Sequence, residues 1–191
     1  AMLFTLVACG GSPPSGGTGS GDTTAGTQTE AMTTAPSTIG ATTGARLYDG
    51  EVGVVMGLAE AVTARTSGRL VSRSAFGNSS ARFDDEWIFG TYYAAAIGFG
   101  QAALEHPELR SRMRQEMERC IDRLLDPRVR SFDSDGWHED ALASLSGPHG
   151  HAAYLGYTGL VLGLHRRVFP DSRFADVQER IYRDLAGFFD K

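Results

Sequence analysis

The stretches WIFGTYYAAAIGFGQAAL, residues 87–104, and HAAYLGYTGLVLGL, residues 151–164, decide the fold of this chain. Neither contains an Asp, Glu, Lys or Arg residue. A helix without charge around its whole circumference is typical of a helix buried on all sides. We therefore expect both stretches to form inner helices of a helical domain.

Each of these uncharged stretches is followed by an amphipathic one. Five helices are expected, over residues 46–66, 84–105, 108–125, 149–168 and 172–189, with Gly, Pro or Asp in most of the gaps. No run alternates between apolar and polar residues with a period of two, so the fold class is all-α. The two amphipathic helices carry apolar stripes made of Leu109, Met113, Met117, Cys120, Ile121 and Leu124, and of Phe174, Val177, Ile181, Leu185 and Phe188.

The alternation of buried and amphipathic helices is typical of consecutive helical hairpins in an α/α toroid, where inner helices line a funnel and outer helices surround them. Glycine destabilises a helix, so the glycines of both inner helices predict a close approach of their backbones. A complete toroid needs more helices than this chain offers, so we expect an incomplete toroid and a truncated chain. A compact five-helix bundle around one central buried helix is the alternative.

Composition separates the chain into a low-complexity part and a folding part. Residues 10–45 consist almost wholly of Gly, Ser, Thr, Pro and Ala, which predicts a disordered tether. Residues 46–191 hold all 18 Lys and Arg and all but two of the 23 Asp and Glu, and form the expected helical domain. Because its arginines are interleaved with acids, this mildly acidic domain is not expected to bind nucleic acid.

The start of the chain points to the cell envelope. Residues 1–9 end in Leu6, Val7, Ala8 and Cys9, which resemble the lipobox of bacterial lipoproteins. That resemblance implies lipid on Cys9, a membrane as partner, and a domain that is periplasmic or surface-exposed. An ordinary secretory signal or a chance apolar start is the alternative. With Cys9 lipidated, Cys120 has no disulfide partner, and no apolar run of transmembrane length follows residue 9.

Candidate site residues gather where the inner helices begin. In a toroid the inner helices are parallel, so their N-termini share one rim. The first cluster lies at residues 84–93 and the second in an expected loop at residues 131–151, and acids with imidazoles at one rim suit general acid/base catalysis. The expected catalytic residues are Asp84, Asp85, Tyr92, His149 and His151, and the expected substrate-binding residues are Trp87, Tyr93, Trp137 and Tyr154.

Structural roles are open for the same residues. Asp84 or Asp85 can serve as a helix N-cap, Tyr92 and Tyr93 as core, and the histidines as local hydrogen-bonding groups. The spacing of His138, Glu139, His149 and His151 matches no zinc motif, so we predict neither metal nor cofactor. His165, Arg166 and Arg167 at a helix C-terminus are interpreted as structural.

The pairing of FDDEWIFGTYY, residues 83–93, with GHAAYLGY, residues 150–157, resembles the opening of linalool dehydratase/isomerase-like domains, and more loosely that of α/α-toroid glycosidases. In the first family an acid, a tyrosine, a histidine and downstream cysteines surround an apolar alcohol. The resemblance implies these roles for Asp84 or Asp85, for Tyr92 or Tyr93, and for His149 or His151. The family's downstream cysteines have no counterpart, because Cys120 lies on an outer stripe.

Together these patterns predict an exported, membrane-anchored lipoprotein whose helical domain is a lyase or hydrolase acting on a small molecule. The alternative is a non-enzymatic helical lipoprotein that binds a partner or has a structural role at the cell envelope. Residues beyond Lys191 that continued the helical pattern would favour the enzyme.

Overall fold

The computed structural model describes residues 50–77, 80–145 and 147–190. The expected lipobox, Cys9 and the expected tether over residues 10–45 lie outside the described residues, as does the start of the first expected helix.

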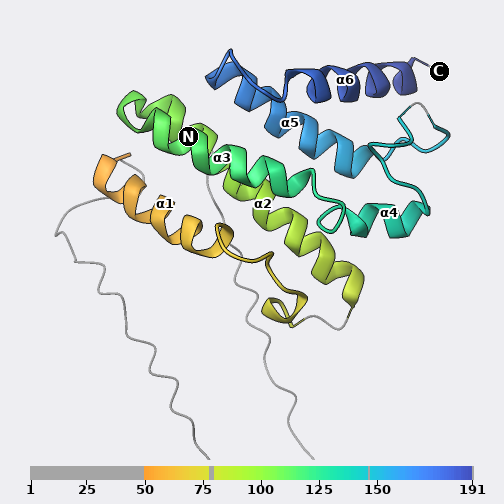
Figure 1. The fold of residues 1–191 in the computed structure, drawn as a ribbon, viewed down its shortest axis with the longest axis horizontal. Helices are drawn as coiled ribbons and strands as arrows, with labels where there is room; N and C mark the ends of the chain where they lie inside the picture. The colour runs from red at the N-terminus through yellow and green to blue at the C-terminus, as the bar shows by residue number, and fades with distance from the viewer. Residues whose placement is uncertain (1–49, 78–79, 146, 191) are drawn as a thin grey trace, which may run out of the picture. The chain divides into compact units, whose positions relative to one another are not determined.

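The described residues form α-helices, with two short 3₁₀ helices between them (Figure 1). The all-α prediction is therefore confirmed. In chain order the elements are α1 (Val52–Thr66), η1 (Arg73–Ala75), α2 (Ala81–Glu105), η2 (Pro107–Leu109), α3 (Arg110–Leu124), α4 (Ser131–Trp137), α5 (Ala152–Val168) and α6 (Ala175–Phe189).

Two helical hairpins make up most of the fold. Helix α2 packs along α3, α5 packs along α6, and α5 also contacts α2 and α3 (Figure 1). Pro107 and Pro170 stand in the turns of the two hairpins, where a proline cannot continue a helix. The expected hairpins over residues 84–125 and 149–189 therefore form.

Helices α2 and α5 run parallel, which brings their N-termini to the same end of the fold. The ring of Phe89 lies 5.7 Å from that of Tyr154, and the ring of Tyr93 lies 4.9 Å from that of Tyr157. Further along, Gly100 packs against Leu164. Positions on the two helices thus advance together, as the sequence predicted for inner helices.

The interior is built mostly from the stripes that the sequence indicated. Met113, Met117, Ile121 and Leu124 of α3 are almost inaccessible to solvent, and so is Ile181 of α6. They meet the apolar residues of α2 and α5 in a single core.

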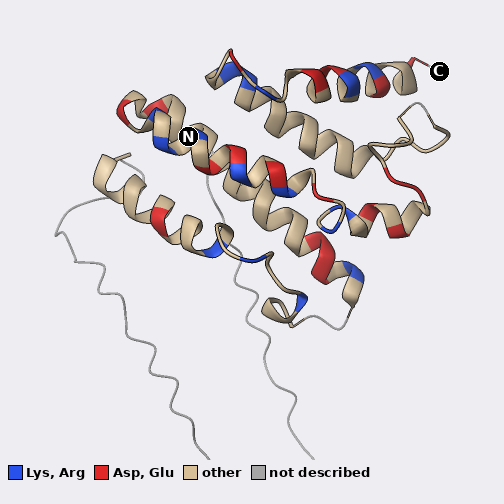
Figure 2. Ribbon diagram, viewed as in Figure 1, with Lys and Arg blue, Asp and Glu red and all other residues tan. Residues whose placement is uncertain are grey.

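Neither α2 nor α5 is buried on all sides, contrary to the prediction. Tyr157 is 51% and Leu160 55% exposed, and Trp87 of α2 is 56% exposed. The reason is that α2, α3 and α6 cover only part of the circumference of α5. Figure 2 shows α5 without charge along most of its length, beside charged α3 and α6.

Candidate functional site

A hollow of about 390 Å³ lies where α2, α4 and α5 meet at their ends. Both parallel helices contribute their first turns to it, so their N-termini lie together, as the sequence predicted. The lining residues are Arg82, Glu86, Phe132, Asp133, Gly136, Trp137, Ala152 and Ala153.

A second hollow of about 340 Å³ adjoins the first, because Arg82, Phe132 and Gly136 line both. Its other polar lining residues are Arg73, Asp85 and Asp135. The first cluster of expected site residues, on α2, and the second, around residues 131–151, therefore border one continuous depression.

Helix α4 was missed by the sequence analysis, which expected a loop over residues 131–151. This helix has seven residues, with Asp133 in its first turn, and it ends at His138 in the left-handed backbone region (φ 58°). It packs against α2. One side of this short helix thus places Phe132, Asp133 and Trp137 around the hollow.

His151 lies between two carboxylates. Its Nδ1 atom is 2.6 Å from Oδ2 of Asp133, and its Nε2 atom is 2.9 Å from Oε1 of Glu139. The His151 side chain is 1% exposed and the Asp133 side chain 4%. The same Glu139 oxygen is 2.8 Å from Nδ1 of His149, whose side chain is 38% exposed.

This geometry fixes how many protons the group holds. Ionised carboxylate oxygens only accept hydrogen bonds, while a neutral imidazole donates from one nitrogen and accepts at the other. For both contacts of His151 to be hydrogen bonds, either the imidazole carries two protons or one of the two carboxyl groups carries one. Asp133, His151 and Glu139 therefore share two protons across two hydrogen bonds.

The pKa values of the two carboxyl groups, of Asp133 and of Glu139, are shifted in opposite directions. Burial raises the pKa of Asp133, although the hydrogen bond from His151 opposes that shift. Hydrogen bonds from His149 and His151 lower the pKa of Glu139. The shared proton is therefore held more readily at the Asp133 end, which is the end that lines the hollow.

The N-terminus of α5 opens onto the same hollow. His151, the residue before α5, has a left-handed backbone (φ 42°), and among the described residues no side chain caps this helix end. Ala152 and Ala153, the first residues of α5, line the hollow. A helix N-terminus carries free N–H groups and partial positive charge, so it favours an anion or developing negative charge beside Asp133.

The expected catalytic residues of α2 are buried and contact other parts of the fold. Both carboxylate oxygens of Asp85 accept hydrogen bonds from Arg73, at 2.6 and 2.5 Å, which ties η1 to α2. Asp84 is buried, and its Oδ1 atom has no hydrogen-bond partner among the described residues. Tyr92 is inaccessible, and its hydroxyl accepts a hydrogen bond from the backbone N–H of Val71.

Of the four expected substrate-binding residues, Trp137 lines the hollow, while Tyr154, Trp87 and Tyr93 pack against other parts of the fold. Trp137 lines the hollow, lies against His149 with ring centroids 4.6 Å apart, and is 47% exposed. Tyr154 is buried, donates to the carbonyl of Leu124, and has its pKa raised to about 12 by burial. Trp87 stacks on Phe76, and Tyr93 packs between Phe89 and Tyr157.

Asp133 is the site residue that the sequence analysis missed, and Glu139 was noticed only as one member of its cluster. Asp133, Gly136 and Trp137 have the spacing of neighbours on one helix face, at i, i+3 and i+4. This spacing in SFDSDGW, residues 131–137, is the signal that could have placed Asp133 beside Trp137.

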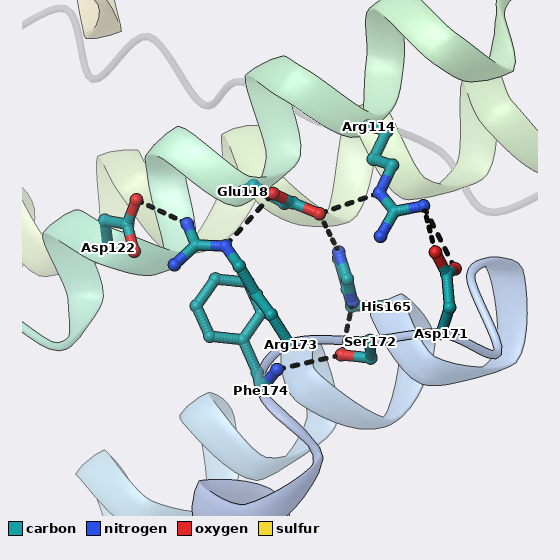
Figure 3. Close-up of polar contacts among 8 residues, drawn as sticks. All are labelled: Arg114, Glu118, Asp122, His165, Asp171, Ser172, Arg173 and Phe174. Atoms are coloured by element: carbon teal, nitrogen blue, oxygen red, sulfur yellow. Dashed lines mark hydrogen bonds and ion pairs between the residues drawn. The ribbon is translucent and has the colours of Figure 1, made fainter.

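A second polar cluster surrounds His165, at the other end of α5 (Figure 3). Its Nδ1 atom is 2.8 Å from Oγ of Ser172, and its Nε2 atom is 3.2 Å from Oε1 of Glu118. Arg114 and Arg173 donate to Glu118, at 2.8 and 3.1 Å.

Ser172, His165 and Glu118 form a row of hydrogen-bonded side chains that resembles a catalytic triad. The contacts of this cluster are nevertheless structural. The Ser172 hydroxyl oxygen accepts from the N–H of Phe174, His165 is wholly buried, and its ring lies between those of Phe169 and Phe174. These contacts fasten α3 to the turn between α5 and α6. The structural interpretation of His165 agrees with this arrangement.

Comparison with protein-family models, curated proteins and solved structures finds no match to this chain. Within residues 50–77, 80–145 and 147–190, no helix combines the length and the apolar character that crossing a membrane requires. The same residues hold no group of three or more His, Cys, Asp or Glu side chains arranged to bind a metal ion.

Proposed function

We propose that this protein is an enzyme, a lyase or hydrolase, in which Asp133 is the general acid. The observation that carries the proposal is the position of this carboxyl group. It is buried, borders the hollow, and is hydrogen-bonded to an imidazole that faces a second carboxylate. A carboxyl group whose pKa is raised by burial keeps its proton to a higher pH than an exposed one does, which suits a general acid.

The chemistry follows from what surrounds Asp133. When a C–O bond of the substrate breaks, the departing oxygen gains negative charge, and Asp133 transfers its proton to that oxygen. The free N–H groups at the start of α5 stabilise negative charge that develops nearby. Phe132 and Trp137 supply apolar walls, so the substrate class is a small neutral molecule with a hydroxyl, ester or glycosidic oxygen.

The two hairpins and their parallel inner helices support an α/α-toroid relationship, and the exposed, uncharged side of α5 is compatible with an incomplete one. We place the enzyme at the bacterial cell envelope, anchored through lipid on Cys9. The support for this placement is the sequence of residues 6–9 together with the Gly/Ser/Thr-rich stretch after it.

The test is turnover of a substrate panel of esters, glycosides and tertiary or allylic alcohols. The wild-type protein should convert one of these classes, and D133N should lose on the order of a hundredfold or more in rate, as expected for a general acid. A153L should fill the hollow and abolish substrate binding. A94L, at an exposed site on α2, should leave both substrate binding and turnover unchanged. Turnover that survives in D133N would disprove the role of Asp133.

A second candidate function is binding of a protein partner without catalysis. The observation that favours it is the exposure of Tyr157 and Leu160 on the uncharged stretch of helix α5. Under this function L160E would abolish binding, and D133N would leave it unchanged. Lipid attachment is tested separately, by the mass of the wild-type and C9S chains isolated from a bacterial membrane fraction.

A further inference from the structure

Two carboxyl groups line the first hollow, and they come from different helices. Asp133 belongs to α4 and Glu86 to α2, and the other lining residues carry no carboxyl group. The surroundings of the two differ, because the Asp133 side chain is 4% exposed and the Glu86 side chain 40%. Two carboxyl groups in unlike environments at one site are typical of enzymes that use one as an acid and the other as a base.

Glu86 forms an ion pair and remains open to water. Its Oε1 atom lies 3.6 Å from Nε of Arg82, one helical turn earlier on α2. At that distance the contact is an ion pair rather than a hydrogen bond, so the carboxylate oxygens are able to accept a hydrogen bond from a water molecule. Arg82 lines the same hollow, which places the ion pair beside any molecule bound there.

The other carboxyl groups near the depression are engaged elsewhere or lie outside the first hollow. Both oxygens of Asp85 accept hydrogen bonds from Arg73. Oε1 of Glu139 contacts the two histidines, and Glu139 does not line the hollow. Asp135 lines only the second hollow. Glu86 is therefore the carboxylate best placed to act together with Asp133.

We propose that Glu86 is the general base that activates a water molecule for attack on the substrate, so that the reaction is hydrolysis and not elimination. This inference rests on the proposed function, because Asp133 must act as the acid. A carboxylate open to solvent has water beside it, and it is too weak a base to take a proton from carbon unaided. The substrates that follow are esters or glycosides, whose C–O bonds are cleaved by water.

The step consumes one water molecule. Glu86 takes a proton from this water while the water oxygen forms a bond to the carbon that carries the departing oxygen. The bond from that carbon to the departing oxygen breaks, its electron pair stays on the oxygen, and Asp133 supplies the proton for it. The products are an alcohol and a sugar or carboxylic acid. Glu86 then releases its proton to solvent, and Asp133 takes one from water that refills the hollow.

The experiment compares variants of Glu86 in turnover of the ester and glycoside panel by the full chain. E86Q should lower the rate by about a hundredfold or more, as expected for loss of a general base. E60Q is the matched control, because Glu60 of α1 forms a similar exposed ion pair, with Arg112 at 3.3 Å, and does not line the hollow. Its rate should equal that of the wild type.

Chemical rescue separates a catalytic role from a structural one. Azide is a small anion that attacks carbon without losing a proton, so it needs no base. In E86A, sodium azide should restore cleavage, and mass spectrometry should find azide in the product in place of the hydroxyl group. A measurement on the wild type covers the case in which neither variant folds: in water enriched in ¹⁸O, one of the two products should carry the label.

Three results would overturn the role of Glu86. They are wild-type turnover in E86Q, an E86A variant that unfolds in urea as the wild type does and stays inactive with azide, and a wild type that only dehydrates alcohols and incorporates no ¹⁸O. Loss of turnover in D133N with full turnover in E86Q removes Glu86 alone and keeps the general acid. Turnover that survives in D133N removes the proposed function itself, so the two failures are distinguishable.

Discussion

Gly100 of α2 faces Leu164 of α5 so closely that a Cβ atom at residue 100 would lie 2.6 Å from Cδ2 and 2.9 Å from Cγ of Leu164. This approach brings the two parallel helices together near their C-terminal ends, away from the hollow at their N-termini. It accounts for a glycine in a helix interior, where glycine is otherwise unfavourable.

We predict that G100A destabilises the protein by about 1–3 kcal/mol through overpacking. G90A, in the same helix, is the matched control. At Gly90 no described atom lies within 4 Å of the added methyl group, so alanine should stabilise the helix by up to about 1 kcal/mol. Urea unfolding of both variants measures the difference, and equal effects of the two would contradict the close approach.

The pKa of Asp133 predicts a dependence of stability on pH. Because burial raises its pKa, the folded state binds the proton more tightly than the unfolded state does. The associated stabilisation is present below the unfolded pKa of about 4 and is lost as pH rises through the folded pKa. The unfolding free energy of D133N relative to wild type should therefore increase with pH across this window, and a flat difference would contradict it.

The lowered pKa of His165 predicts the opposite dependence of stability on pH. Burial lowers its pKa, against the opposing effect of Glu118, so the folded state prefers the neutral ring. The corresponding stabilisation is present above the unfolded pKa of about 6.5 and is lost as pH falls toward the folded pKa. Thermal unfolding at a series of pH values should show this acid loss in wild type and a smaller one in H165Q. Because H165Q also removes buried hydrogen bonds, the slope with pH is the quantity to compare.

Cys120 should be inert toward thiol reagents in the folded protein. It is 1% exposed, and burial raises its pKa to about 12, so the reactive thiolate is scarce. In a C9S background, labelling of Cys120 should proceed only as fast as the fold opens and should accelerate in urea. Rapid labelling in native buffer would show that α3 is less tightly packed than described.

The sequence predicted the helices well because hydrophobic periodicity reports which faces are buried. Four of the five expected helices were placed to within three residues at each end, and the first, expected from residue 46, begins at Val52. The expected burial of α5 on all sides was wrong, since an uncharged stretch shows what a helix can bury and not what is available to cover it. Tyr157 and Leu160 make this difference visible.

The candidate site was predicted only in part. His151 and Trp137 lie where the rim was expected, because parallel inner helices bring their N-termini together. Asp133 was missed because a seven-residue helix spans too few turns for periodicity to stand out from a loop. The pairing of Asp85 with Arg73 depends on the path of residues 67–77, which no local pattern specifies.

The left-handed backbone at residue 151 limits which residues suit this position. Glycine or asparagine adopts that conformation at lower cost than histidine. Neither of them, however, carries a ring that could make the contacts of His151 with Asp133 and Glu139. Backbone conformation and side-chain contacts therefore favour different residues at position 151.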